Sequence, residues 1–224
     1  MGSKFKILVL AICLNASLFL AMPAFADSVL AIPGGVGSLT YFGGEYAGPI
    51  GATLNGNAIP GGIVCDDINA QTSVPNPGFS VYVSELSPGD MTNVRFGADP
   101  NALFDYEEAS WLVGQMAKNP TQIGEMQFAV WRIFTPDARS TRGWVSYEDR
   151  KIENTWMAEA ATAVLAGNLN YSSVRIYTPV DTANQEFISG GPTPTATPEP
   201  PTLLLVGFGL ACLAGCRLRR RGRA

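Results

Sequence analysis

Two side chains of this sequence, the thiol of Cys65 and the carboxamide of Gln127, have the chemistry to react with each other. A cysteine thiolate can attack a glutamine carboxamide, expel ammonia and leave an internal thioester, if both groups are held in contact and sheltered from water. The reaction needs no histidine, and the sequence contains none. The sequence therefore has the parts of a Cys65–Gln127 thioester, with the aromatic neighbours Trp131 and Phe134 as its shield.

Gln127 interrupts an apolar helical pattern. At 100° per residue, Ile123, Gln127, Val130, Trp131 and Phe134 fall within about 100° of one another, so the amide lies near the centre of the apolar stripe. A buried amide without partners costs roughly 1 to 3 kcal/mol. Gln127 must therefore have a reason to be there, either a hydrogen bond to a strand backbone or the thioester.

Cys65 is the one cysteine outside the two apolar ends of the chain, since Cys13 lies in the first and Cys212 and Cys216 lie in the last. If both ends are removed by processing, an exported domain with one thiol remains, and it has no internal disulfide partner. Such a thiol is buried, paired between chains or chemically masked. A structural Cys and Gln, or an intermolecular disulfide, are therefore the alternatives to a thioester.

The N-terminus has the three parts of a secretory signal peptide over residues 1–26. Lys4 and Lys6 precede an apolar run, and Ala24 and Ala26 form an A-x-A cleavage site before Asp27. We expect the mature chain to begin at Asp27.

The C-terminus consists of a Pro/Thr spacer over residues 192–201, an apolar segment over 202–216 and an arginine-rich tail over 217–224. Such a spacer favours an extended, polyproline-like conformation. The apolar segment is shorter than the roughly 20 residues of a permanent membrane span. The arginines predict that the tail is held in the cytoplasm, with the exported domain on the other side of the membrane.

Pro198-Glu199-Pro200, the apolar segment and Arg219-Arg220-Arg221 occur in the order that resembles the PEP-CTERM sorting signal, over about the last 27 residues. The resemblance implies a Gram-negative bacterium whose membrane exosortase cleaves near Pro-Glu-Pro. The protein would then pass from the inner membrane to the cell surface or the exopolysaccharide matrix.

Residues 27–191 are long enough for one domain with its own core. Short β-branched and aromatic segments with turn signals such as Asn55-Gly56 predict strands up to Phe96. Helix starts are predicted at Asp105–Glu108, at Asn119-Pro120 and at Ser146–Asp149, and closing strands over 174–178 and 185–188. The fold expected is α+β: an antiparallel sandwich or barrel-like sheet with a three-helix insertion before the closing strands.

Val64-Cys65-Asp66-Asp67 and Gln127-Phe128-Ala129-Val130-Trp131 resemble the cysteine and glutamine motifs of bacterial thioester domains, the adhesion modules of Gram-positive surface proteins. The resemblance implies that Cys65 and Gln127 are the cross-linked pair. The chain departs from that pattern at Met126, where those domains usually have threonine, and at Val64, where an aromatic residue or leucine normally precedes the cysteine. The repeat stalk that follows those domains is also absent.

Charge and composition exclude several functions. The segment between the apolar ends carries eight basic and 19 acidic residues, a net charge of −11, which would repel nucleic acid. The absence of histidine removes Ser-His-Asp and Cys-His catalysis and the usual zinc sites. Asp66-Asp67 with Glu107-Glu108 has no D-x-D-x-D alternation, so a solvated acidic edge is favoured over a calcium site. No metal or cofactor is expected.

The function expected is covalent adhesion, in which an amine on a surface protein or polysaccharide opens the Cys65–Gln127 thioester. This is single-turnover chemistry, so the protein is not predicted to be an enzyme. The alternative is a noncovalent structural or glycan-binding protein of the exopolysaccharide or biofilm matrix. For that alternative Trp144, in a loop beside Arg142-Gly143, is the candidate for sugar stacking.

Overall fold

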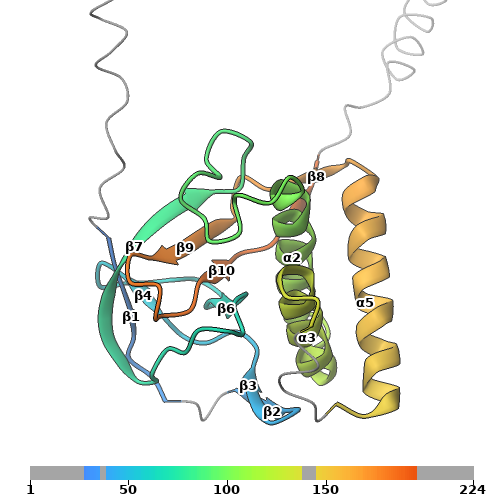
Figure 1. The fold of residues 1–224 in the computed structure, drawn as a ribbon, viewed down its shortest axis with the longest axis horizontal. Coiled ribbons are helices and arrows are strands. Elements are labelled where there is room, and N and C mark those ends of the chain that lie inside the picture. Colours follow the sequence, from blue (N-terminus) through green and yellow to red (C-terminus); the bar gives the residue numbers. More distant parts are fainter. Residues whose placement is uncertain (1–27, 36–38, 138–144, 196–224) are drawn as a thin grey trace, which may run out of the picture.

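A computed structural model of the chain describes residues 28–35, 39–137 and 145–195 (Figure 1). Ala24 and Ala26, Trp144, the apolar segment 202–216 and the sorting signal lie outside these residues. Within the described ranges, no helix has the length and apolar character needed to cross a membrane.

The described elements alternate in the order that the sequence predicts, with strands first, then helices, then closing strands. They are β1 (Ser28–Ile32), β2 (Thr40–Phe42), β3 (Glu45–Ala47), β4 (Thr53–Leu54), β5 (Asn57–Ala58), β6 (Val64–Cys65), β7 (Asn76–Glu85), α2 (Ala102–Met116), the 3₁₀ helix η2 (Pro120–Gln122), α3 (Ile123–Phe134), α5 (Tyr147–Leu165), β8 (Leu169–Asn170), β9 (Arg175–Pro179), β10 (Phe187–Ser189) and β11 (Thr193–Pro194).

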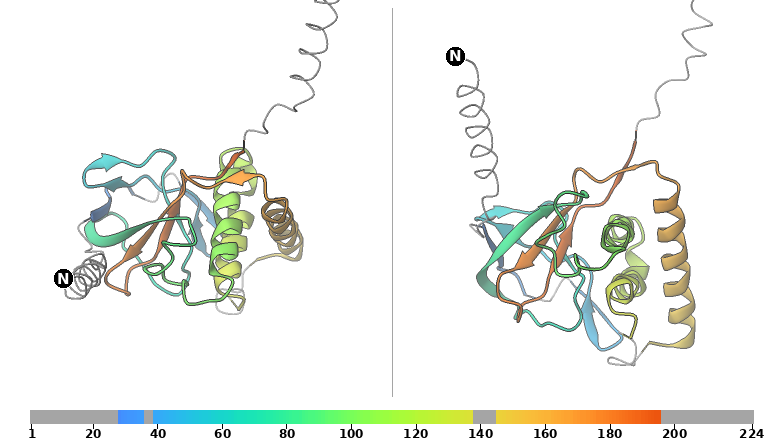
Figure 2. Two further views of the ribbon diagram at one scale, coloured as in Figure 1. Left: turned by 90° about the horizontal axis from the view of Figure 1, so that it is seen from above. Right: turned by 45° about the horizontal axis from the view of Figure 1, so that its top comes forward.

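One antiparallel sheet of seven strands, in the order β5-β4-β1-β7-β9-β10-β6, forms the β half of the domain and curls into a half-barrel (Figures 1 and 2). The late strands β9 and β10 lie between β7 and β6, which confirms that they return to the early sheet. The α+β class and the barrel-like curvature are confirmed. The alternative of a two-sheet sandwich is wrong for the described residues, because helices cover the sheet where a second sheet would lie.

Three helices stand beside the sheet, with α2 and α3 between it and α5 (Figures 1 and 2). Their apolar side chains form the larger core cluster together with residues of the last strands. Its fully buried members include Leu112 of α2, Met126 of α3, Ile176 of β9 and Ile188 of β10. The core thus fixes α3 against the end of the sheet that holds β6 and β10.

Two local signals in the sequence are confirmed. Ser146 and Asp149 form a reciprocal capping box at the start of α5, with the Asp149 N–H donating to the Ser146 hydroxyl at 3.1 Å. Asn55 and Gly56 both have positive φ, 51° and 80°, as a two-residue hairpin turn between β4 and β5 requires.

Two other predicted helix starts are corrected. Helix α2 begins at Ala102, so Asp105 lies inside its first turn and forms no capping box. Because Ala102 is buried in the folded domain, the helix begins before the predicted polar start at Asp105. Asn119-Pro120 opens the short helix η2 rather than α3, which begins at Ile123.

Candidate functional site

Cys65 lies at the end of the sheet, on the short strand β6, where it is paired with Phe187 of β10. The residue is partly exposed and has no disulfide partner among the described residues. Its thiol donates to the backbone carbonyl of Asp67, with an Sγ–O distance of 3.2 Å. The strand therefore holds the thiol in one orientation at the side of the sheet that faces α3.

Gln127 lies on the adjacent face of α3 and is 1% exposed. Its Nε2 donates to the backbone carbonyl of Cys65 at 2.6 Å, and its Oε1 accepts from the backbone N–H of Gly48 at 3.2 Å. The amide is thus satisfied by strand backbone, as one of the two sequence-based explanations requires. Both ends of the carboxamide are held, and the residue that holds the nitrogen is Cys65.

Gly48 can supply its N–H only because it is a glycine. Its φ is +105°, and a Cβ at this position would come within 2.6 Å of the Ile123 side chain. The sequence analysis did not single out this position. A glycine directly after a short strand was the available signal, but it did not indicate which group the N–H would meet.

Cys65 and Gln127, 62 positions apart in the chain, line the same cavity of about 320 Å³. Trp131, one helical turn after Gln127 and 3% exposed, also lines it. The remaining lining residues are contributed by β1, β3, β10 and the loops around them: Ile32, Leu39, Glu45, Tyr46, Gly48, Ile50, Gln71, Thr72, Ser73, Val74, Gln185 and Phe187.

Phe134 does not line this cavity. It stacks on Phe96 at 4.7 Å and contacts Tyr106 at 4.6 Å, measured between ring centroids. Phe134 shares the helix face of Gln127 but lies about 10 Å further along the axis, because each residue adds about 1.5 Å of rise. Of the two residues predicted to shield the pair, Phe134 therefore lies away from the cavity and Trp131 lines it.

The environment of the Cys65 thiol keeps it protonated. Burial raises the pKa of Cys65 well above its usual value, and the neighbouring charge of Asp66 adds to the rise. The indole of Trp131 and the backbone at Asp67 lower the pKa of Cys65 in part. The Trp131 Nε1 is buried and forms no hydrogen bond of normal geometry within the described structure.

Asp66 and Asp67 are buried, at 0% and 3% exposure, so the expectation of a solvated acidic edge is wrong for this pair. Asp67 forms an ion pair and hydrogen bond with Arg95. Burial and the neighbouring Glu186 carboxyl raise the pKa of Asp66 well above its usual value. Two buried carboxyl groups with raised pKa values, Asp66 and Glu186, thus lie next to the strand that carries Cys65.

Glu186 is the centre of this buried network and is fully buried itself. Its carboxylate accepts from the Tyr106 hydroxyl, the Thr178 hydroxyl and, at 2.8 Å, the Arg95 backbone N–H. Its own backbone carbonyl accepts from the Asp66 N–H at 3.2 Å. An acidic residue inside the predicted closing strand 185–188 was the signal for this network in the sequence, and it was missed.

Carboxyl groups of α2 give a testable pH dependence. Burial raises the pKa of Glu108 to about 7, with a contribution from Asp105, and burial with the charge of Asp99 raises the pKa of Asp105 to about 6. Each group binds its proton more readily in the folded than in the unfolded chain. Their stabilising contribution is therefore complete at about pH 4 and is lost as pH rises through 6 and 7.

We accordingly expect the free energy of unfolding, measured by urea titration, to fall steadily between pH 5 and pH 8. Asp66 and Glu186 act in the same direction, since their pKa values are raised as well. Glu108→Gln should flatten the slope and be more stable than the wild type at pH 8. A free energy of unfolding that rises over this interval would contradict the assignment.

Glu107 and Glu108 lie on α2, and the described residues contain no group of three or more His, Cys, Asp or Glu side chains able to hold a metal ion.

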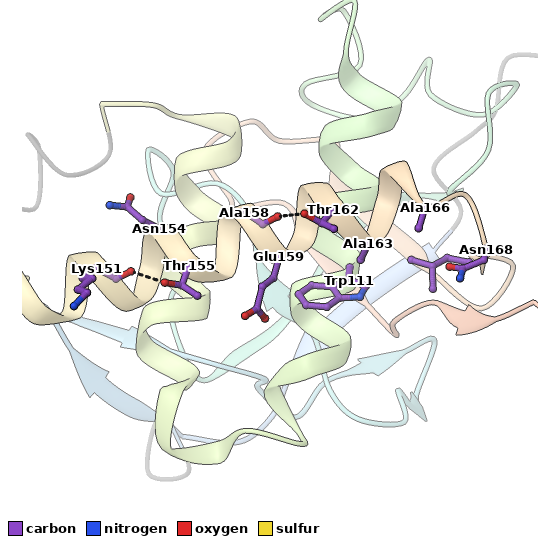
Figure 3. A pocket seen from close by; sticks show the side chains of 11 residues that line it. Trp111, Lys151, Asn154, Thr155, Ala158, Glu159, Thr162, Ala163, Ala166 and Asn168 are labelled. Carbon is purple, nitrogen blue, oxygen red and sulfur yellow. Dashed lines mark hydrogen bonds between the residues drawn. The ribbon is translucent and has the colours of Figure 1, made fainter.

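A second, more open groove of about 880 Å³ lies along α5 (Figure 3). Trp111 projects into it from α2, and α5 contributes the carboxylate of Glu159 and the hydroxyls of Thr155 and Thr162. Trp111 lies partly in the core, in contact with Trp156 at 6.1 Å between ring centroids. Its exposed part faces the groove.

The C-terminal segment of the chain matches a known family model. Residues 196–221 match the model of the PEP-CTERM protein-sorting motif. The chain carries an exosortase sorting signal. The prediction made on Pro198-Glu199-Pro200 and the arginine cluster is thereby confirmed: this PEP-CTERM protein is exported, is processed by exosortase at the membrane, and is directed to the cell surface.

A solved structure is distantly similar to this chain. The N-terminal domain of the Streptococcus pyogenes pilus tip adhesin Cpa is similar to this chain at 10% sequence identity, with a TM-score of 0.46 over 79% of this chain and 97% of that one. No curated protein matches the sequence.

Proposed function

We propose that this PEP-CTERM protein attaches covalently to amine-bearing partners at the cell surface or in the matrix, through a thioester between Cys65 and Gln127. The observation that carries the proposal is the fixed carboxamide of Gln127: its nitrogen is held by the Cys65 carbonyl, its oxygen by the Gly48 N–H, and it shares a cavity with the Cys65 thiol. Two reactive groups held in this way are positioned before they react.

Thioester formation needs no group from outside the cavity. The Cys65 sulfur attacks the amide carbon, the S–C bond forms, the C–N bond breaks, and the thiol proton leaves on the nitrogen as part of ammonia. Negative charge that develops on Oε1 during the attack is stabilised by the Gly48 N–H. Because the pKa of Cys65 is raised, the attack starts from the protonated thiol, whose proton must pass to the departing nitrogen.

Adhesion is the reverse type of step with a new amine. The neutral amine of the partner attacks the thioester carbon, its nitrogen forms an amide with Gln127, the C–S bond breaks, and the amine proton passes to Cys65 as the thiol returns. Each protein reacts once, so the protein acts as an adhesin and not as an enzyme.

The intact mass of the processed protein, recovered from a host that cleaves its sorting signal, tests this proposal. We expect a mass lower by one ammonia, replaced after incubation with methylamine by an adduct that peptide mapping places at Gln127. Cys65→Ala should remove both the deficit and the adduct. Gln71→Ala changes an exposed amide that lines the same cavity and should retain both.

The proposal fails if the wild-type protein has its full mass in several preparations and Cys65 titrates as a free thiol on unfolding. Noncovalent glycan binding is the second candidate, favoured by the groove in which Trp111 lies beside Glu159 (Figure 3). For that function, Cys65→Ala should retain the binding of matrix polysaccharide in full, whereas Glu159→Gln should weaken it.

A further inference from the structure

Two tyrosines stand on the hairpin β2–β3 at the side of the Cys65–Gln127 cavity. Tyr41 and Tyr46 are paired across the hairpin, with ring centroids 5.3 Å apart in an edge-to-face arrangement. They are 67% and 50% exposed, so both rings face solvent. Tyr46 also lines the cavity, and the pair therefore forms an aromatic platform that continues into the reaction site.

The platform is fixed in relation to the cavity. Phe42, on the opposite face of the hairpin, contacts Phe128 of α3 edge-to-face at 5.5 Å between ring centroids. Gly124 of α3 admits this ring, since a Cβ there would lie 2.2 Å from it. Gly48, just after β3, donates to Gln127 itself. The hairpin that presents the tyrosines is thus attached to the helix that presents the carboxamide.

The rim of the cavity is polar. Gln71, Thr72, Ser73 and Gln185 supply amides and hydroxyls to it. The segment between the apolar ends of the chain has a net charge of −11. A cationic partner is therefore attracted to this surface, and an ammonium group can also contact a tyrosine ring through a cation–π interaction.

The size of the platform favours a polymer of small units over a folded protein. Stable protein interfaces bury about 800 Å² on each partner, whereas the exposed aromatic surface here consists of two rings. Sugar rings need only one aromatic face each for stacking, and their hydroxyls match the amides and hydroxyls of the rim. A cavity of about 320 Å³ is at the small end of ligand sites and has room for about one sugar unit.

From these observations we infer that the partner of the thioester is a cationic polysaccharide with free primary amines, held on Tyr41 and Tyr46 while one of its amino groups enters the cavity. The inference rests on the proposed function for its covalent step. In that step the sugar amine forms the amide with Gln127, the C–S bond breaks, and the amine proton passes to Cys65.

A competition between amines tests the inference on the processed protein. We expect a short glucosamine oligomer to form the Gln127 adduct at a much lower amine concentration than methylamine. Tyr41→Ala should reduce the ratio of the two labelling rates roughly tenfold, by loss of a stacking and cation–π contact, and Tyr41→Phe should restore most of it. Tyr147→Ala removes a tyrosine that is 79% exposed on α5 and should leave the ratio as it is.

Two further measurements separate this inference from the proposed function. In a Cys65→Ala background no adduct can form, and noncovalent binding of the glucosamine oligomer should remain and should depend on Tyr41. Binding of this kind with a full-mass wild-type protein would sink the thioester and keep the platform. Equal ratios in the wild type and Tyr41→Ala, equal binding of the fully N-acetylated oligomer, or faster labelling by oligolysine would overturn the cationic polysaccharide.

Discussion

Replacing Gln127 by leucine in a Cys65→Ala background should lower the free energy of unfolding by about 3 kcal/mol and the melting temperature by roughly 10 °C. The background removes any covalent cross-link, so the comparison measures the carboxamide alone. Leucine has a similar volume but no polar atoms. It leaves the Gly48 N–H and the Cys65 carbonyl unpaired in a buried place, and each such group costs about 1 to 3 kcal/mol.

Gln122→Leu is the matched control for this substitution. Gln122 is also a glutamine with one side-chain contact, accepting from the Trp156 indole at 3.1 Å, but it is only half-buried. We expect its loss to cost less than about 1 kcal/mol, because water can replace the partner. Equal effects of the two substitutions in urea unfolding would mean that the Gln127 contacts do not hold the helix to the strand.

Replacing Glu186 by alanine should have the largest effect on stability among the single substitutions considered, a loss of about 3 to 5 kcal/mol. The change removes the acceptor for Tyr106, Thr178 and Arg95 at once and leaves their donors buried without partners. A loss of this size is a large part of the roughly 5 to 15 kcal/mol that stabilises a typical domain.

Glu186→Gln should cost less than half as much, because the amide keeps the shape and one acceptor and removes the repulsion between two buried carboxyl groups. Thermal melts of both variants at pH 5 and pH 8 provide the measurement. The wild type should approach Glu186→Gln in stability as pH rises, because carboxyl groups whose pKa values are raised by folding lose their stabilising contribution in that direction. If Glu186→Ala stays within 1 kcal/mol of the wild type, the network does not hold β6 against β10.

Gln127 and Glu186 hold the segment that carries Cys65 from two sides. Gln127 fixes α3 to the Cys65 carbonyl, and Glu186 fixes β10 to Asp66, the residue after Cys65. The strand that carries the thiol is only two residues long, so it has little hydrogen bonding of its own to hold it. Buried polar contacts on both sides supply the rigidity that a reaction between two side chains requires.

Features that depend on neighbouring residues could be predicted from the sequence. The C-terminal sorting signal is identified by Pro198-Glu199-Pro200, an apolar run and arginines in that order, without reference to the fold. The capping box at Ser146, the Asn55-Gly56 turn and the burial of Gln127 follow from chemistry and periodicity within a few positions. Each of these interactions forms within one helical turn or one hairpin, so residues that are close together in the sequence determine its energy.

Contacts between groups that are distant in the sequence could be seen only in the folded domain. The pairing of β6 with β10 brings Glu186 to Asp66 and turns an expected solvated edge into a buried network. Phe134 shares the helix face of Gln127, but it lies further along the axis of α3, where it stacks on Phe96 and does not line the cavity. The hairpin with Tyr41 and Tyr46 reaches the cavity through its contacts with α3. Such pairings are set by the order of strands and the packing of helices over many residues, which no local pattern encodes.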